Sequence, residues 1–280
     1  MTLEEELLEL AIREDIGDGD HSSLSCIPHD AMGKARLLIK EDGILAGLDV
    51  AVRVFKRYDA TLEVEVLLKN GNEVKCGDIG LYVSGRKQSI LSAERVVLNL
   101  MQRMSGIATN TARIMKLVEG TSVKILDTRK TTPGLRWYEK KAVEIGGGTN
   151  HRFGLYDMMM LKDNHIDYAG GIEKAISKAK AYLKEKGKNI PIEVETRNMN
   201  EVKEVLKYGP VDRIMLDNFT PDEIREALKV INGVCATEAS GGITEETVRS
   251  YAETGVDYIS MGALTHSVKS MDISLKAIEI

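Results

Sequence analysis

The sequence predicts an α/β chain of two parts, an α+β region followed by a reduced α/β barrel. The length of 280 residues corresponds to about two domains of roughly 150 residues each. The first 105 residues mix strand-like and helix-like runs without strict alternation, which is typical of an α+β domain. From about residue 122 onward, strand-like and helix-like runs alternate, which predicts a parallel sheet.

The elements of the N-terminal region follow from the periodicity of its apolar residues. Residues 3–13 place apolar side chains at helical spacing, and residues 61–68 alternate as a half-buried strand does. Asn70-Gly71 is typical of a tight turn between strands. Further strands are expected at 34–40 and 79–83, and a second helix at 89–104.

The C-terminal region contains six strand-like runs, at 122–127, 158–161, 191–195, 213–216, 234–239 and 257–261. Helix-like segments lie between them at 171–186, 199–207, 221–230 and 244–254, with Thr220 and Thr244 as expected helix starts. Polar residues follow each strand, and in a βα barrel all these ends meet at one mouth. The region has about 160 residues, whereas an eight-stranded barrel usually needs about 250, so we expect six or seven strands.

Composition and charge exclude several classes of protein. The net charge of −5 argues against a nucleic-acid binder, which carries a basic stripe. No apolar stretch approaches the roughly 18 residues of a membrane span, and the start MTLEEELLEL is too acidic for a secretory signal. The cysteines at 26, 76 and 235 show no CxxC spacing, which argues against a disulfide framework. We expect a cytoplasmic protein that binds neither nucleic acid nor a membrane.

The last two strand ends favour a phosphate site. They read EASGGIT at 238–244 and SMGALTHS at 260–267, and small residues let backbone amides approach an anion. Barrel enzymes often bind phosphate at these two loops, and a helix starting near Thr244 would direct its positive end there. The candidate residues are Ser240, Gly241, Gly242 and Gly262. The alternative is that these glycines only form tight turns.

A basic segment inside this acidic chain predicts an anion site. Residues 129–152 carry six Lys and Arg against two Glu, a local charge of +4. Guanidinium groups bind carboxylates and phosphates with direction, and Arg129 and Lys130 directly follow a strand. A solvated helix face is the alternative, and it suits Lys140 and Lys141.

Two acids and one lysine complete the candidate site. Glu195 and Asp217 follow adjacent strands, where they could hold Mg²⁺, stabilise a developing positive charge, or form salt bridges with the basic segment. Lys162 ends an apolar strand and is the lysine expected to be desolvated, as a Schiff-base nucleophile or, better, as a contact to an anion. No histidine pair has HExxH spacing, and His165 and His266 either line the mouth or cap loops.

Six motifs in order resemble the quinolinate phosphoribosyltransferase family, also called nicotinate-nucleotide pyrophosphorylase (carboxylating). They are LDTRKTTPGLR at 126–136, GGGTNHRFGLYDMMMLKDNH at 146–165, IEVE at 192–195, IMLDN at 214–218, EASGGI at 238–243 and GVDYISMGALTHS at 255–267. The resemblance extends through SAERVVLNLMQRMSGIAT at 92–109 and so covers nearly the whole chain.

The resemblance implies an N-terminal α/β sandwich domain at 1–107, a barrel at 108–267, and a tail at 268–280 that is a candidate to return to the sandwich. It implies that quinolinate and phosphoribosyl pyrophosphate (PRPP) react with Mg²⁺ to give nicotinate mononucleotide, pyrophosphate and CO₂. It also implies a homodimer in which one sandwich domain covers the partner's barrel mouth. Further assembly into hexamers stays open.

The resemblance assigns roles to individual residues. The quinolinate carboxylates would contact Arg129, His151, Arg152, Lys162 and, across the dimer, Arg95 of the partner subunit. Lys130, Lys162, Glu195 and Asp217 would be catalytic, with the two acids also serving Mg²⁺ and the ribose hydroxyls. Ser240, Gly241, Gly242 and Gly262 match the phosphate loops of the family.

Three other functions compete with this interpretation. A paralogue from molybdate-uptake loci would keep the phosphate loops but vary the dicarboxylate contacts, and the intact set at 129, 151, 152 and 162 argues against it. A Schiff-base aldolase would use Lys162 as its nucleophile. A non-catalytic phosphate-binding module would have little use for paired acids opposite an anion site.

Overall fold

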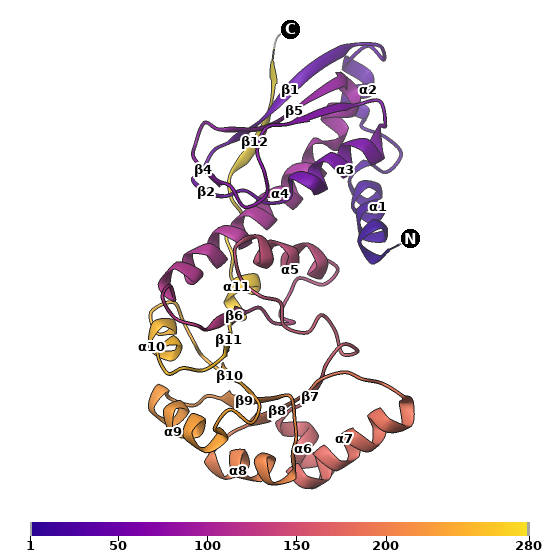
Figure 1. Cartoon of the computed structure of the whole chain (residues 1–280). Coiled ribbons are helices and arrows are strands. Elements are labelled where there is room, and N and C mark those ends of the chain that lie inside the picture. Colours follow the sequence, from indigo (N-terminus) through magenta and orange to yellow (C-terminus); the bar gives the residue numbers. More distant parts are fainter. Residues whose placement is uncertain (1, 279–280) are drawn as a thin grey trace. The chain divides into compact units, whose positions relative to one another are not determined.

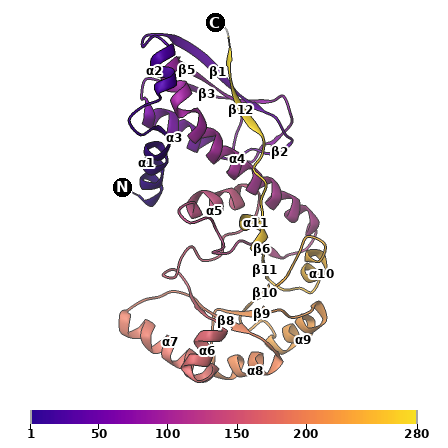
Figure 2. The same ribbon diagram turned by 180° about the vertical axis from the view of Figure 1, so that it is seen from behind.

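The computed structural model describes residues 2–278 and divides into two compact units (Figures 1 and 2). The first unit contains the chain up to Ala112, residues 131–147 and the chain from Leu264 onward. The second contains Arg113–Lys130 and Gly148–Ala263. The 31-residue helix α4 runs from the first unit into the second.

The first unit is built on an antiparallel four-stranded sheet in the order β12-β1-β5-β3. Its elements are α1 (Leu3–Ile16), α2 (His21–Cys26), β1 (Met32–Ile39), β2 (Gly43–Ile44), α3 (Leu48–Tyr58), β3 (Glu63–Val66), β4 (Glu73–Val74), β5 (Ile79–Arg86), α4 (Lys87–Leu117, in part), α5 (Arg136–Ile145) and β12 (Ile273–Ile278). In both views α3 and α4 lie along one face of the sheet (Figures 1 and 2). Alternate residues of β1 are buried, as expected of a sheet with one covered face.

The strands predicted at 34–40 and 79–83 are confirmed as β1 and β5. The segment 61–68 is less regular than its alternation indicates. It forms the four-residue edge strand β3, and Val66 is exposed while Leu62 is fully buried. An edge strand pairs on one side only, so the apolar alternation overstates its burial.

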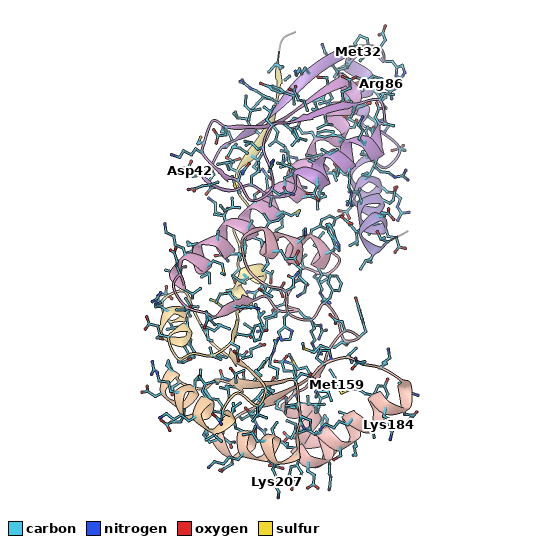
Figure 3. The ribbon with its side chains drawn as sticks, viewed as in Figure 1. Met32, Asp42, Arg86, Met159, Lys184 and Lys207 are labelled. Carbon is cyan, nitrogen blue, oxygen red and sulfur yellow. The ribbon has the colours of Figure 1, made fainter. Side chains whose placement is uncertain are left out.

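The second unit is a barrel-like parallel sheet of six strands in the order β6-β11-β10-β9-β8-β7. Its elements are β6 (Lys124–Leu126), β7 (Met159–Leu161), α6 (Asp163–Ala169), α7 (Ile172–Lys186), β8 (Ile192–Thr196), α8 (Met199–Tyr208), β9 (Arg213–Asp217), α9 (Pro221–Ile231), β10 (Ala236–Ser240), α10 (Val248–Ala252) and β11 (Tyr258–Ser260), with the short α11 (Ala263–His266) at its boundary. Helices α6 to α9 follow the outside of strands β7 to β10 (Figure 1). Figure 3 marks Met159 at the start of β7 and Lys184 on α7.

The strand order supports the barrel prediction. The first strand of the unit, β6, pairs with the last, β11, which an open sheet with an internal switch point would not show. No ladder joins β6 to β7 within residues 2–278, and the free edge of β6 is instead extended by a parallel bridge between Leu126 and Thr149. The six strands therefore form an incomplete barrel.

Residues 131–147 group with the first unit, whereas the boundary predicted from sequence places them in the barrel. Glu139 of α5 explains this grouping. It is fully buried and accepts hydrogen bonds from Nε and Nη2 of Arg103, at 3.1 and 2.9 Å, and from the amide of Thr132. The C-terminal strand β12 pairs with β1, so this part of the tail lies in the sheet of the first unit.

Candidate active site

The acids predicted to be functional lie at neighbouring strand ends of the barrel. Glu195 is near the end of β8, and Asp217 and Ser240 are the last residues of β9 and β10. Asp217 and Ser240 are register partners, and Glu195 pairs with Met215 two residues earlier on β9. Because parallel strands deliver their carboxyl ends to one side, these three side chains share the mouth of the barrel.

Lys162 lies at the same mouth, paired with an acid. Its Nζ is 3.6 Å from Oε2 of Glu195. Burial raises the pKa of Glu195, Lys162 opposes that rise, and the charge of Asp217 adds to it. The prediction that Lys162 is desolvated is wrong, because 48% of its side chain is exposed. It precedes α6 at the rim, which suits a charge contact better than a Schiff base.

Two arginines form the cationic side of the site. Arg152 is 9% exposed, and its Nη1 donates to the carbonyl of Met158 at 3.2 Å. Burial and the nearby Arg129 both lower the pKa of Arg152. Keeping two guanidinium groups together in a partly desolvated site costs free energy, which an anionic ligand would offset.

Beneath the mouth lies a group of buried charges that sequence reasoning missed. We call His151, Glu193, Arg213 and Glu238 the inner charge cluster. Nε2 of His151 is 3.2 Å from Glu193 and 3.4 Å from Glu238, and Nη1 of Arg213 is 2.6 Å from Glu238. The sequence IEVE at 192–195 could have indicated it, because side chains alternate along a strand and Glu193 therefore lies on the same face as Glu195.

His151 was predicted from the resemblance to contact quinolinate, and the structure places its ring within the inner charge cluster. Its side chain is 4% exposed. Burial alone would lower the pKa of His151, but the neighbouring carboxylates of Glu193 and Glu238 raise it to about 9. The ring is thus held by carboxylates of the protein itself.

The predicted phosphate loop has the backbone conformation that requires glycine. Gly241 and Gly242 have φ values of 96° and 60°, and a Cβ on Gly241 would collide with Oδ1 of Asn218. The predicted helix start at Thr244 is wrong. The helix α10 begins at Val248 and has only five residues, because Thr244 to Thr247 form a turn closed by their own side chains. A helix dipole therefore adds little here.

The remaining candidate residues have varied surroundings. Lys130 is exposed next to Arg129, and its amide donates to the hydroxyl of Thr128. Nδ1 of His165 accepts the amide of Lys162 at 3.0 Å, which makes His165 a capping residue of α6. Arg95 is exposed on α4 in the first unit.

The basic segment 129–152 is divided between the two units. Arg136, Lys140 and Lys141 belong to α5 of the first unit, while Arg129 and Arg152 belong to the barrel. Lys140 was predicted to be solvated on a helix face, but it is only 1% exposed. Neighbours in the charged segment therefore belong to different structural units.

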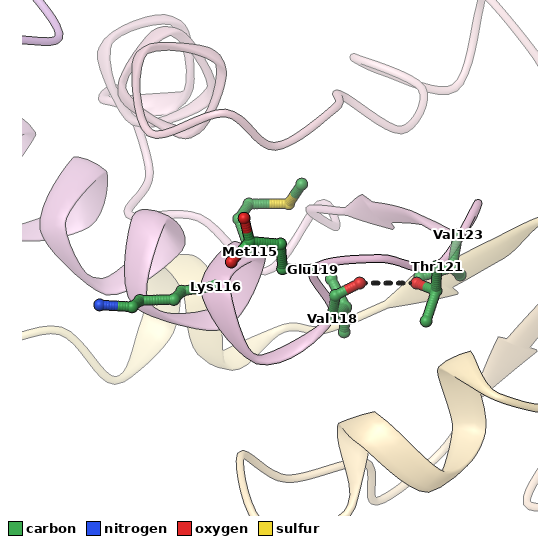
Figure 4. Close-up of a pocket in the computed structure, with 6 residues that line it drawn as sticks. All are labelled: Met115, Lys116, Val118, Glu119, Thr121 and Val123. Atoms are coloured by element: carbon green, nitrogen blue, oxygen red, sulfur yellow. Dashed lines mark hydrogen bonds between the residues drawn. The ribbon is translucent and has the colours of Figure 1, made fainter.

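A hollow of about 420 Å³ lies away from these residues (Figure 4). It is lined by the end of α4 and the chain leading into β6, where the Thr121 hydroxyl donates to the Val118 carbonyl at 2.7 Å. This is the amino-terminal side of β6, and catalytic groups of barrel enzymes gather at the opposite side. We do not assign the active site to it.

The fold is that of a barrel-like α/β protein, with acids, a lysine and a glycine loop at the carboxyl ends of its parallel strands. The chain matches the model "Quinolinate phosphoribosyl transferase, C-terminal domain" over residues 107–276 and the corresponding N-terminal domain over 20–105. It therefore belongs to the quinolinate phosphoribosyltransferase family.

Individual relatives agree with this assignment. A chloroplastic nicotinate-nucleotide pyrophosphorylase (carboxylating) of Oryza sativa is 48% identical over 285 residues, which cover 96% of this chain and 76% of that protein. A probable enzyme of the same name from Bacillus subtilis is 44% identical and covers 96% of this chain and 91% of its own. The crystal structure of NadC from Streptococcus pyogenes superposes with a TM-score of 0.92 at 41% identity, covering 98% and 97% of the two chains.

Proposed function

We propose that this chain transfers the phosphoribosyl group of PRPP to quinolinate and releases pyrophosphate and CO₂, giving nicotinate mononucleotide. Membership of the quinolinate phosphoribosyltransferase family supports this activity. The single structural observation that carries it is the pair Arg129 and Arg152, which share a partly buried site. Two guanidinium groups match the two adjacent carboxylates of quinolinate in charge.

The acids at the mouth fit the departure of pyrophosphate from PRPP. Loss of pyrophosphate builds positive charge at the ribose carbon, and Glu195 and Asp217 would stabilise it. Lys162, held beside Glu195, would contact a quinolinate carboxylate, and Lys130 would face the pyrophosphate. The loop of Ser240, Gly241 and Gly242, with Gly262 on the next loop, would receive phosphate through backbone amides.

Decarboxylation needs no further protein group in this proposal. Once ribosylated, the pyridine nitrogen is cationic, and it accepts the electron pair left when the adjacent carboxylate departs as CO₂. Arg152 would hold the ring while the bond breaks. The protein then contributes orientation and exclusion of water.

Residues at the mouth fit a magnesium ion delivered largely with PRPP. Mg²⁺ prefers oxygen ligands and is commonly bound by one or two carboxylates plus substrate phosphates. Glu195 and Asp217 lie at the ends of the adjacent strands β8 and β9 and would supply these carboxylate oxygens. When bound, the ion would neutralise charge on the departing pyrophosphate.

We further propose a homodimer in which Arg95 of the partner subunit contributes to each site. Arg95 is exposed on α4 and therefore accessible to a partner.

A cytoplasmic location suits the chain, because its cysteines at 26, 76 and 235 are unpaired. Within residues 2–278, no helix has the length and apolar character to cross a membrane.

A product assay tests the activity. Purified protein is mixed with quinolinate, PRPP and Mg²⁺, with nicotinate as the parallel acceptor. We expect nicotinate mononucleotide and CO₂ from quinolinate alone. A folded protein that converts neither acid would shift the proposal to another acceptor, as in the molybdate-locus paralogue.

A mixing experiment tests the shared site. Arg95→Ala and Arg152→Ala subunits are each expected to be inactive. Combined in verified heterodimers, they should regain part of the wild-type activity, because one of the two sites is then intact. No recovery would refute the contribution of Arg95 across the dimer.

A further inference from the structure

The inner charge cluster combines one residue from each of three neighbouring strands with one from the segment after β6. Glu193, Arg213 and Glu238 come from β8, β9 and β10, and Glu193 and Arg213 are register partners. Both glutamate side chains are fully buried and that of Arg213 is 14% exposed. The guanidinium of Arg213 also lies 4.0 Å above the ring of Tyr258, which closes the cluster on the β11 side.

Stability alone does not explain this arrangement. Barrel interiors are usually filled by branched apolar side chains, and a buried set of ion pairs is often no more stable than apolar residues of similar volume. The cluster is also a poor cation site, although His151, Glu193 and Glu238 have ligand atoms within 4.8 Å of one another. Arg213 already supplies a positive charge 2.6 Å from Glu238.

The cluster connects directly to the proposed quinolinate site through the chain at 151 and 152. The amide nitrogen of Arg152 lies 2.6 Å from Nδ1 of His151, while the amide of His151 donates to Asp127 at 2.8 Å. On the other side of the ring, Nε2 faces Glu193 and Glu238. Both ring nitrogens therefore face protein groups, and the backbone from which Arg152 extends lies against the ring.

We propose that Glu193, Glu238 and Arg213 are positioning residues that act through His151. They hold the imidazole so that Arg152 presents its guanidinium to a ligand carboxylate at the mouth. This inference rests on the proposed function, because it assumes that Arg152 binds a dicarboxylate. The cluster would determine how tightly that dicarboxylate is bound and how it is oriented. The binding of PRPP would depend on the cluster much less.

The test compares Glu193→Gln and Glu238→Gln with the matched control Glu226→Gln, which makes the same chemical change at an exposed position of α9. The first measurement is calorimetric binding of phthalate, an unreactive aromatic dicarboxylate. The second is the KM for quinolinate and for PRPP separately, and the third is the midpoint of thermal unfolding. Arg213→Lys tests rescue, since it keeps the positive charge.

We expect both cluster variants to bind phthalate at least tenfold more weakly and to raise the KM for quinolinate by a similar factor, with the KM for PRPP within twofold. Arg213→Lys should retain most of the affinity, and the control should match the wild type. Equal losses for both substrates, or lower stability with unchanged phthalate binding, would overturn the proposal. If the Gln variants do not fold, Ser260→Ala carries the test, because Ser260 is a neighbour of Glu238 and helps to lower its pKa. An unchanged phthalate affinity in this variant would refute the inference.

The outcomes separate this inference from the proposed function. A wild type that neither binds phthalate nor converts quinolinate contradicts the function itself. A wild type that does both, with variants equal to it, contradicts only the role of the cluster.

Discussion

Asp59 in the first unit and Glu193 in the second are both buried carboxylates, but their surroundings shift their pKa values in opposite directions. Asp59 of the first unit accepts hydrogen bonds from the amide and hydroxyl of Thr61, the hydroxyl of Ser89, and both Nε and Nη2 of Arg86. Burial alone would raise the pKa of Asp59, but these donors outweigh it and hold the pKa well below its ordinary value. Asp59 thus carries a permanent charge that joins α3, β5 and α4.

Glu193 of the second unit has the titratable neighbours His151 and Glu238. Within the described residues its oxygens accept no well-aligned hydrogen bond, although Nε2 of His151 lies 3.2 Å away. Burial and the charge of Glu238 raise the pKa of Glu193. The comparison teaches that Asp59, which accepts several hydrogen bonds, stabilises the fold. Glu193, whose pKa depends on titratable neighbours, is the kind of carboxylate that is found near functional sites.

The largest expected difference between the two regions is in activity. Arg152→Lys should lower kcat/KM for quinolinate on the order of a hundredfold or more, because an ammonium group cannot replace two directed bonds of about 1.5–3 kcal/mol each. Arg86→Lys is the matched control, since Arg86 also donates twice, but to Asp59. Steady-state measurement of kcat/KM for quinolinate in both variants tests this prediction. Near-wild-type kcat/KM in Arg152→Lys would remove Arg152 from the site.

The next effect is on stability. Asp59→Asn should lower the free energy of unfolding by about 3 kcal/mol, because it leaves Arg86 facing a neutral group in a buried network. Urea titration measures this loss. Activity per folded molecule should stay unchanged, and a specific loss of quinolinate binding in this variant would break the distinction between the two carboxylates.

The two regions should also lose stability at opposite ends of the pH scale. The folded pKa of Asp59 lies below its ordinary 3.8, so its contribution is present above that value and is lost as the pH falls further. The folded pKa of His151 is about 9 against an ordinary 6.5, so its contribution is present below pH 6.5 and is lost as the pH rises toward 9.

Unfolding free energies measured from pH 2 to pH 10 should therefore fall at both ends, by about 1–3 kcal/mol on the alkaline side. Asp59→Asn should flatten the acidic loss and His151→Gln the alkaline one. An alkaline loss that persists in His151→Gln would contradict the assignment of that loss to the inner charge cluster.

The smallest stability change is expected at the mouth. Lys162→Ala should alter the free energy of unfolding by less than about 1 kcal/mol, because the half-exposed Lys162 lies 3.6 Å from Glu195 and solvent screens this ion pair. Its turnover of quinolinate should nevertheless be lost. A variant that is active but markedly less stable would make Lys162 a structural residue.

Local patterns were sufficient for most of the fold and for part of the site. The alternating strands and helices after residue 122 predicted the parallel sheet, and Glu195, Asp217 and Ser240 were found because each lies at the end of a predicted strand. Local patterns misjudged Lys140, which is buried although its neighbours in sequence are polar. They also placed the start of α10 too early.

The sequence by itself determined the elements, their order and the residues at the strand ends, because side-chain periodicity and turn residues act over a few neighbours in the chain. Tertiary structure alone decided that residues 131–147 join the first unit, and that His151 meets Glu193 and Glu238. Those partners come from the separate strands β8 and β10, and only the packing of the strands in the parallel sheet brings them to His151. Their burial, which sets their charge, likewise exists only after the barrel has assembled.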